Sequence, residues 1–168
     1  MQYKDLQEFK VKSKISLSQL KTSRNLGMDK EELKDGLKET REKLGEWQDT
    51  LYAYGKYSVL ICLQGMDTAG KDSLIREVFR DFNSRGVVVH SFKVPTVKEL
   101  KHDFLWRHYI ALPERGKFGV FNRTHYENVL VTRVHPEYIL NENLPGIEAV
   151  SDIDEDFWDQ RFEQIRDF

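Results

Sequence analysis

The sequence predicts an α/β domain with a parallel sheet, and three features support this class. Short apolar runs at 58–64, 87–92 and 116–121 have the composition of buried strands. Stretches with helical periodicity separate these runs, and such alternation favours parallel strands connected by helices. A glycine-framed loop from Gly65 to Ser73 joins the first strand to the next helix. With 168 residues, 39% of them hydrophobic, the chain can bury the core of one domain.

A long amphipathic helix is expected before the first strand. Asp29 followed by Glu32 is a capping-box start. Apolar residues then follow at helical spacing as far as Gly55, namely Leu33, Leu37, Leu44, Trp47, Leu51 and Tyr54. We expect this helix to pack on the core or on another copy of itself. The segment before it, to about Leu26, is basic and weakly patterned, which predicts an irregular arm.

The loop GMDTAGKDS predicts a phosphate-binding site. A strand that leads into GxxxxGK and then a helix directs backbone N–H groups, a helix N-terminus and the Lys71 ammonium at one point, which suits a polyanion. This context indicates a P-loop kinase-like three-layer sandwich. The candidate phosphate-binding residues in the loop are Gly65, Met66, Thr68, Ala69, Gly70, Lys71, Asp72 and Ser73.

Two carboxylates in this loop indicate a magnesium ion. Asp67 lies inside the loop, where its charge would repel phosphate oxygens. A magnesium ion removes this conflict, because Mg²⁺ binds one or two carboxylates together with substrate phosphates. Asp72 stands where Ser or Thr usually follows the lysine, and a hydroxyl comes next at Ser73. We therefore expect Asp67 to bind the metal, supported by Asp72 or Ser73; the alternative is a chance match in which Asp67 caps a turn.

Three helices are expected after the loop. The first spans about 71–84, the second begins at Pro95 and is ended by Pro113, and the third is a capped acidic helix from Ser151. Three strands are fewer than the five or so typical of such sheets. We therefore divide the chain into an arm and helix at 1–56 and an incomplete α/β core at 57–168.

The ends of the second and third strands add candidate site residues. Ligands of a doubly wound sheet collect at the carboxyl ends of its strands. Lys93 follows the second strand, and Asn122 and Arg123 end the third, where a P-loop enzyme places a second metal-directed carboxylate. Asn122 can only bind a metal weakly, whereas the planar fork of Arg123 suits phosphate oxygens. Arg133 could join Arg123 from a helix.

Charge is distributed unevenly, although the net charge is only −2. Residues 71–135 carry 12 Lys and Arg against 7 Asp and Glu, whereas residues 136–168 carry 2 against 10. The first balance favours an anionic substrate larger than one phosphate, although ordinary solvated faces would also explain it. The candidate residues for a polyanion channel are Lys93, Lys98, Lys101 and Arg107.

Other patterns limit the function. The single cysteine, Cys62, lies in an apolar strand, so we expect a small core residue and no disulfide framework. No HxxH or HExxH pair accompanies it, which makes a zinc site unexpected. No secretory h-region or long apolar run is present, and we expect a cytoplasmic protein. We assign no catalytic role to the histidines or to Tyr126.

Five segments of the chain resemble the second polyphosphate kinase family, whose members move a phosphoryl group between inorganic polyphosphate and a nucleotide. The segments are GMDTAGKDS, FKVPT at Phe92 to Thr96, HDFLWRH at His102 to His108, LPERGKFGVFNRTHYENVLVTRVH at Leu112 to His135, and DFWDQRFEQI in the final helix. The resemblance covers most of the chain from about Tyr57. Its Asn122 variant is similar to a subgroup that accepts nucleoside mono- and diphosphates.

The resemblance implies catalytic roles for three residues: Lys71 on the transferred phosphate, Asp67 on Mg²⁺ and Arg123 on the phosphate chain. Arg133 matches another arginine of the motif, and Asn122 remains a candidate metal ligand. The implied partners are inorganic polyphosphate and adenine or guanine nucleotides, with no nucleic acid and no membrane, and a homo-oligomer is expected. Family members continue with further strands and an arginine-bearing lid, which this chain lacks.

Three functional hypotheses follow. The first is Mg²⁺-dependent phosphoryl transfer between polyphosphate and AMP or ADP. The second is a catalytically inactive phosphate-binding or interaction fragment of such an enzyme, which the missing strands favour. The third keeps the enzyme but makes it an ATP-dependent kinase of a small molecule. No adenine-clamping or acceptor-pocket pattern is visible in the sequence to support the third hypothesis.

Overall fold

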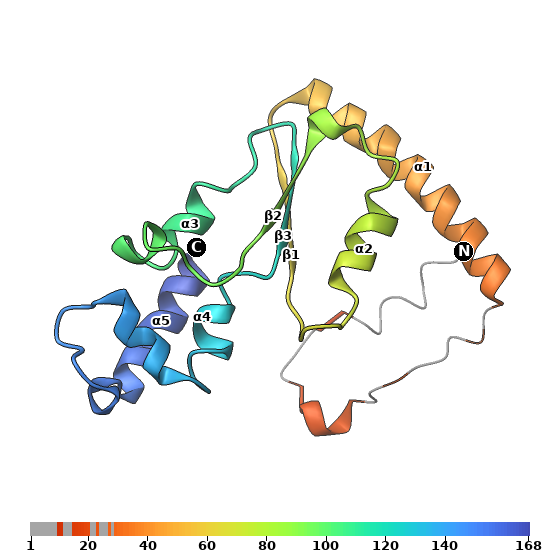
Figure 1. Cartoon of the computed structure of the whole chain (residues 1–168). Helices are drawn as coiled ribbons and strands as arrows, with labels where there is room; N and C mark the ends of the chain where they lie inside the picture. The colour runs from red at the N-terminus through yellow and green to blue at the C-terminus, as the bar shows by residue number, and fades with distance from the viewer. Residues whose placement is uncertain (1–9, 12–14, 21–22, 24–26, 28) are drawn as a thin grey trace.

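A computed structural model describes residues 10–11, 15–20, 23, 27 and 29–168 (Figure 1). The predicted arm before Leu26 therefore lies mostly outside the described residues. Within it, the structure describes one short 3-10 turn, Leu17–Gln19. Among the described residues, no helix is both long and apolar enough to cross a membrane.

The sheet has three parallel strands in the order β1-β3-β2, which confirms the predicted parallel α/β class. The strands are β1 (Val59–Leu63), β2 (Val87–Ser91) and β3 (Phe118–Asn122). Asn122 at the end of β3 is in register with Leu63 of β1 and with Ser91 of β2. All three carboxyl ends therefore lie at the same edge of the sheet.

Helices cover both faces of the sheet and make three layers (Figure 1). On one side lie α1 (Lys30–Tyr54) and α2 (Lys71–Val78). On the other lie α3 (Trp106–Tyr109), α4 (Glu127–Leu130) and α5 (Glu155–Asp167). Short 3-10 turns connect them, at Ser84–Gly86, Glu99–Lys101, Pro136–Glu142 and Val150–Asp152.

Helix α1 begins and ends where its capping residues predict. The Asp29 carboxylate accepts a hydrogen bond from the Glu31 backbone N–H at 2.9 Å. Gly55 ends the helix with φ 63°, a left-handed conformation that glycine adopts without strain. Along its inner face, the buried Gln48 side chain donates to the Asn83 carbonyl at 2.8 Å and accepts from the Asn83 N–H at 2.7 Å. A buried amide therefore attaches α1 to the segment between α2 and β2.

The predicted helix at 71–84 is too long, because α2 ends at Val78. Phe82 turns toward the sheet and packs edge-on against Phe118, with ring centroids 5.2 Å apart. Asn83 has φ −66° and ψ 123°, an extended conformation in which its backbone bonds Gln48. These tertiary contacts require the chain to leave the helix, and the predicted turn at Ser84–Gly86 follows.

The helix predicted between Pro95 and Pro113 is wrong as a single element. It is divided into the turn Glu99–Lys101 and the short helix α3. His102 between them is extended, with φ −121° and ψ 166°. The Asp103 carboxylate then accepts from the Leu105 N–H at 2.8 Å and starts a new turn.

The predicted start of the last helix at Ser151 is also wrong by several residues. Ser151 lies in a 3-10 turn, and α5 is capped by Asp154, which accepts from the Phe157 N–H at 2.9 Å. The apolar face of α5 joins a core cluster made of Phe104, Leu105, Val129, Ile139, Trp158 and Ile165. A buried ion pair between Arg161 and Glu142, with N–O distances of 3.0 and 2.6 Å, attaches α5 to the turn Pro136–Glu142.

The expectation that Cys62 is a core residue is wrong, because Cys62 is exposed. Among the described residues, β1 pairs with β3 on one side only and is an edge strand. The central strand β3, in contrast, is buried in its first four residues. Position in the sheet, which an apolar run alone does not reveal, decides the difference.

Candidate active site

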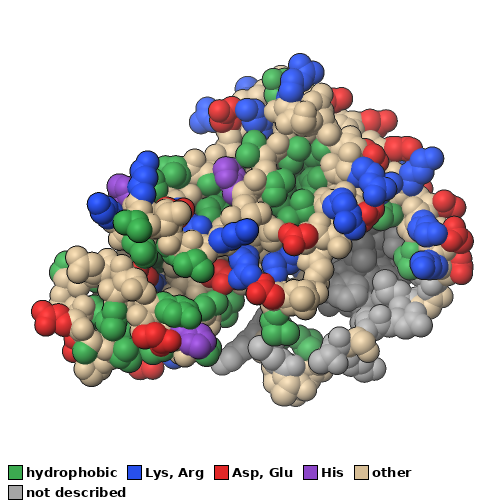
Figure 2. Space-filling model, viewed as in Figure 1, with side chains coloured by type: hydrophobic (Ala, Val, Ile, Leu, Met, Phe, Trp, Pro, Cys, Tyr) green, Lys and Arg blue, Asp and Glu red, His purple; other side chains and the backbone are tan. Residues whose placement is uncertain are grey.

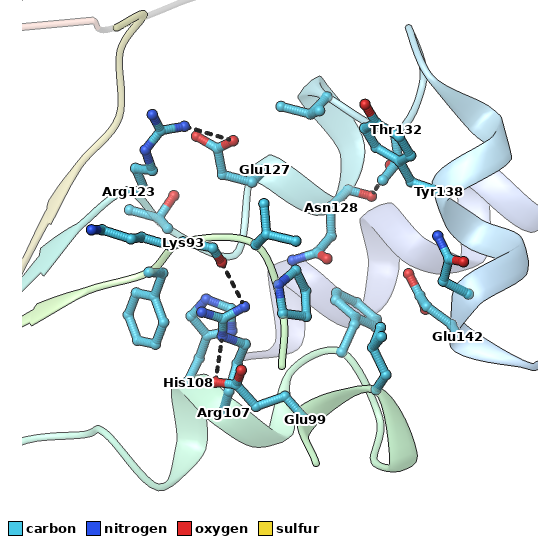
Figure 3. Close-up of a pocket in the computed structure, with 18 of the residues that line it drawn as sticks. Lys93, Glu99, Arg107, His108, Arg123, Glu127, Asn128, Thr132, Tyr138 and Glu142 are labelled. Atoms are coloured by element: carbon cyan, nitrogen blue, oxygen red, sulfur yellow. Dashed lines mark hydrogen bonds and ion pairs between the residues drawn. The ribbon is translucent and has the colours of Figure 1, made fainter. Parts of the chain in front are cut away.

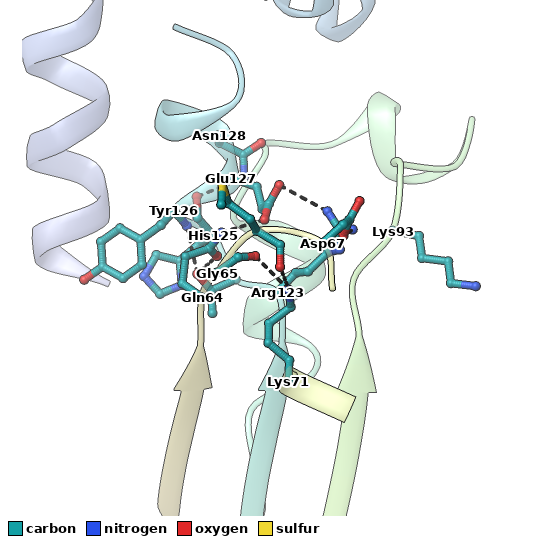
Figure 4. Close-up of polar contacts among 12 residues, drawn as sticks. Gln64, Gly65, Asp67, Lys71, Lys93, Arg123, His125, Tyr126, Glu127 and Asn128 are labelled. Carbon is teal, nitrogen blue, oxygen red and sulfur yellow. Dashed lines mark hydrogen bonds and ion pairs between the residues drawn. The ribbon is translucent and has the colours of Figure 1, made fainter. Parts of the chain in front are cut away.

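The glycine-rich loop at 65–73, or phosphate loop, lies at the carboxyl end of β1 and leads directly into α2, whose first residue is Lys71. Gly70 caps the helix with φ 92°, and Thr68 has φ 65°. The Lys71 ammonium donates to the carbonyl oxygens of Gly65 at 2.7 Å and Met66 at 2.8 Å. The lysine charge therefore lies across the loop, beside the helix N-terminus (Figure 4).

Arg123 joins the loop from the end of β3. Its guanidinium forms an ion pair with Asp67, and its Nη1 lies 3.7 Å from a carboxylate oxygen of Glu127. The backbone has φ 64°, which costs on the order of 1–3 kcal/mol for a non-glycine residue. The Arg123 N–H donates to the Leu63 carbonyl at 3.1 Å, so contacts with β1 and two carboxylates offset this strain.

Asn122 contacts the first turn of α2. Its side-chain Nδ2 donates to Asp72 Oδ1 at 2.6 Å and to Ser91 Oγ at 3.4 Å. The structure therefore brings Asn122 and Asp72 together, while Ser73 is exposed on α2. This contact joins the ends of β2 and β3 to the phosphate loop.

The donor set fits magnesium. Within the part of the chain that the structure describes, no group of three or more His, Cys, Asp or Glu could hold a metal ion. Magnesium does not need such a group, since it binds one or two carboxylates with phosphates and waters. Asp67, with a side chain 77% exposed, and Asp72 are oxygen donors of this kind.

A second set of polar contacts at the site was not predicted. Glu127, the first residue of α4, accepts from Gln64 Nε2 at 2.6 Å, and Gln64 Oε1 accepts from the Thr124 hydroxyl at 2.9 Å (Figure 4). Gln64 is the residue before the glycine loop. No local pattern indicates the contact between Gln64 and Glu127, because 63 residues separate them in the chain.

A pocket of about 450 Å³ adjoins the loop site (Figure 3). The segment after β2, the residues around α4 and the turn Pro136–Glu142 form its walls. The lining includes apolar residues such as Phe92, Val94, Phe104, Val131 and Tyr138. Arg123 and Lys93 lie on its wall, so the pocket and the phosphate loop share a border. The sequence showed no such pocket, because segments distant in the chain form it.

The four predicted channel residues lie in different surroundings. Arg107 is largely buried, forms an ion pair with Glu99 at 3.2 Å and donates to the Lys93 carbonyl at 3.0 Å. Lys98 lies over the Trp106 ring, 5.7 Å from its centroid, and Lys101 is exposed. Figure 2 shows Lys and Arg side chains gathered near the middle of the face below the hydrophobic surface of the sheet, with acidic side chains among them.

Arg133 is directed toward α5. Its Nη2 lies 3.5 Å from Glu155, and its guanidinium lies over the rings of Trp158 and Phe162 at 5.7 and 5.9 Å. These contacts do not bring Arg133 to the phosphate loop. Arg133 follows the short helix α4 and matches an arginine of the family motif, and its role in phosphate binding stays a prediction.

His108 is buried below the pocket, with its ring centroid 4.3 Å from that of Phe92 and 5.7 Å from that of His125. Burial is the main cause that lowers the pKa of His108 to about 4, and the neighbouring His125 and Arg107 contribute to this shift. Burial also lowers the pKa of His125. Both rings are therefore neutral packing residues at pH 7.

This burial predicts a loss of stability in acid. The unfolded His108 imidazole titrates near 6.5, so between pH 6.5 and about 4 the unfolded state binds more protons than the folded state. The free energy of unfolding should fall by up to about 3 kcal/mol as the pH drops through this range. Urea unfolding at pH 7 and pH 4.5 should show a clearly smaller drop for His108→Leu. An identical drop in both proteins would contradict the prediction.

The parallel sheet, the glycine loop and the lysine at the start of α2 define a P-loop α/β protein. The family model for Polyphosphate kinase 2 (PPK2) matches residues 27–165. The chain belongs to the polyphosphate kinase 2 family, as its sequence motifs predicted.

Two relatives and one solved structure illustrate the similarity. An ADP-polyphosphate phosphotransferase of Rhodopseudomonas palustris is 45% identical over 137 residues, which cover 82% of this chain and 46% of the relative. An AMP/ADP-polyphosphate phosphotransferase of Meiothermus ruber is 43% identical over 126 residues, which cover 75% of this chain and 42% of the relative. The crystal structure of Polyphosphate Kinase 2 from Arthrobacter aurescens TC1 matches with a TM-score of 0.80 and 33% identity, covering 97% of this chain and 54% of that chain.

The structural match confirms the predicted P-loop kinase-like fold. The chain spans about half the length of the curated relatives it matches.

Proposed function

We propose that the protein is a Mg²⁺-dependent phosphotransferase that moves a phosphoryl group between inorganic polyphosphate and AMP or ADP. One observation carries this proposal: Arg123 borders both the phosphate loop and the 450 Å³ pocket. A phosphate chain on the loop and a nucleotide in the pocket would therefore meet at one arginine. The names of the two relatives describe this pair of substrates.

The residues of the loop would bind the donor. Backbone N–H groups and the N-terminus of α2 attract phosphate oxygens, and the Lys71 ammonium would neutralise the transferred group. Asp67 and Asp72 would hold Mg²⁺, which supplies charge neutralisation at the phosphate oxygens when bound. The Asp67–Arg123 ion pair would then open, so that Arg123 contacts phosphate.

The pocket would bind the nucleoside of the acceptor. Its apolar lining suits a flat base, and its size is that of a small-molecule site. The acceptor phosphate would point toward Arg123 at the border. An oxygen of that phosphate attacks the terminal phosphorus of polyphosphate, the bridging P–O bond breaks, and the shortened chain leaves with its negative charge, which requires little general-base catalysis.

The test is product formation by the 168-residue protein with magnesium, polyphosphate and either ADP or AMP. We expect ATP from ADP and ADP from AMP, measured by chromatography. Comparing polyphosphate with ATP as the donor separates this function from an ATP-dependent kinase. One alternative is a non-catalytic phosphate-binding unit. Binding of polyphosphate without any nucleotide product would support that alternative and contradict the proposed function.

A further inference from the structure

The Glu127 carboxylate contacts two side chains, one with each of its oxygens. Its Oε1 accepts from Gln64 Nε2 at 2.6 Å, and its Oε2 lies 3.7 Å from Arg123 Nη1. The side chain is 23% exposed, against 77% for Asp67, the other carboxylate on Arg123. Glu127 is therefore the more enclosed of the two partners, and solvent screens its charge less.

The Gln64 contact fixes the direction of the Glu127 carboxylate. Gln64 follows β1 and immediately precedes the glycine loop, and its Oε1 accepts from the hydroxyl of Thr124 at 2.9 Å. Thr124 is 1% exposed and belongs to the segment that joins β3 to α4. The Gln64 amide is thus held by Thr124 and by Glu127. This fixes the position of the Glu127 carboxylate between the phosphate loop and the end of β3.

We propose that Glu127 is a positioning residue that keeps the Arg123 guanidinium at the border of the pocket once Asp67 binds magnesium. This inference rests on the proposed function, which gives Asp67 to the metal. Arg123 then loses its more exposed partner and retains Glu127. Without that partner, the long side chain would be free to turn into solvent, since its side chain is already 35% exposed.

The negative charge of Glu127 also opposes phosphate binding, and an experiment can separate this repulsion from the positioning of Arg123. A carboxylate near bound phosphates repels them, so its removal alone would strengthen phosphate binding. A positioning role requires the reverse, because misplacement of a binding group by about 1 Å can reduce turnover on the order of 100-fold. The sign of the change in phosphate affinity therefore distinguishes them.

The test is a double-mutant cycle of Glu127→Gln and Arg123→Ala. Glutamine keeps the shape of the side chain and an oxygen for Gln64 but removes the charge that faces Arg123. We expect Glu127→Gln alone to weaken the binding of magnesium pyrophosphate, measured by calorimetry, by about 10-fold and to lower kcat on the order of 10- to 100-fold. In the Arg123→Ala background, the same change should have almost no further effect.

The matched control is Glu155→Gln, which removes the partner of Arg133 at 3.5 Å, away from the loop. It should leave both pyrophosphate affinity and kcat unchanged, and the melting temperatures of all variants show whether folding is intact. Tighter pyrophosphate binding in Glu127→Gln, or effects that add in the double variant, would overturn the proposal. If the wild-type protein binds pyrophosphate but forms no ATP, the proposed function fails, while the binding cycle still tests Glu127.

Discussion

Lys71→Ala should reduce the formation of ATP from polyphosphate and ADP by about 1,000-fold, the largest effect of any single change in the site. The Lys71 ammonium lies between the carbonyl oxygens of Gly65 and Met66, at the mouth of the phosphate loop. The variant has no positive charge at this position, whereas the backbone N–H groups of the loop and the N-terminus of α2 would still bind phosphate. The loss should therefore appear mainly in kcat.

Initial rates with saturating polyphosphate and ADP measure this effect. Lys34→Ala is a suitable control, because Lys34 pairs with Glu31 on the exposed surface of α1. That variant should keep wild-type rates. If Lys71→Ala retained more than about a tenth of the activity, the ammonium could not be the group that neutralises the transferred phosphate.

Asp67→Asn should raise the magnesium concentration needed for half-maximal rate by about 10- to 100-fold. The amide keeps the shape of the carboxylate but not the charge that attracts the ion. It also releases Arg123 from the ion pair described above. The rate at very high magnesium should therefore recover substantially, which separates a metal ligand from a group needed for folding.

A magnesium titration at fixed polyphosphate and ADP measures this change. Asp159→Asn on α5, outside the site, serves as the control and should give the wild-type titration. An unchanged half-saturating magnesium concentration in Asp67→Asn would show that the metal is held elsewhere.

Local patterns predicted the parts of the fold that depend on neighbouring residues. The three strands and the start of α1 follow from apolar runs and from the cap at Asp29. The glycine loop was placed correctly at the strand–helix junction, because glycine, lysine and a preceding apolar run are all local signals. Phosphate contact by its residues remains a prediction.

The remaining errors come from contacts between distant segments. Helix α2 is short because Asn83 bonds the buried Gln48 of α1, a pairing 35 residues apart that no periodicity reveals. The pocket and the Gln64–Glu127 contact likewise join segments from different strands and helices. An apolar run predicts a strand covered on both sides, whereas Cys62 lies exposed on an edge strand of the described sheet.

The position of β1 has a consequence for handling the protein. Val59–Leu63 contains no charged residue or proline, and in the described part of the chain one side of its backbone has no strand partner. Such an edge is a template for pairing with another polypeptide, so concentrated samples should tend to aggregate through this strand. The single thiol of Cys62 lies on that strand, where a fluorescent label could report the association directly.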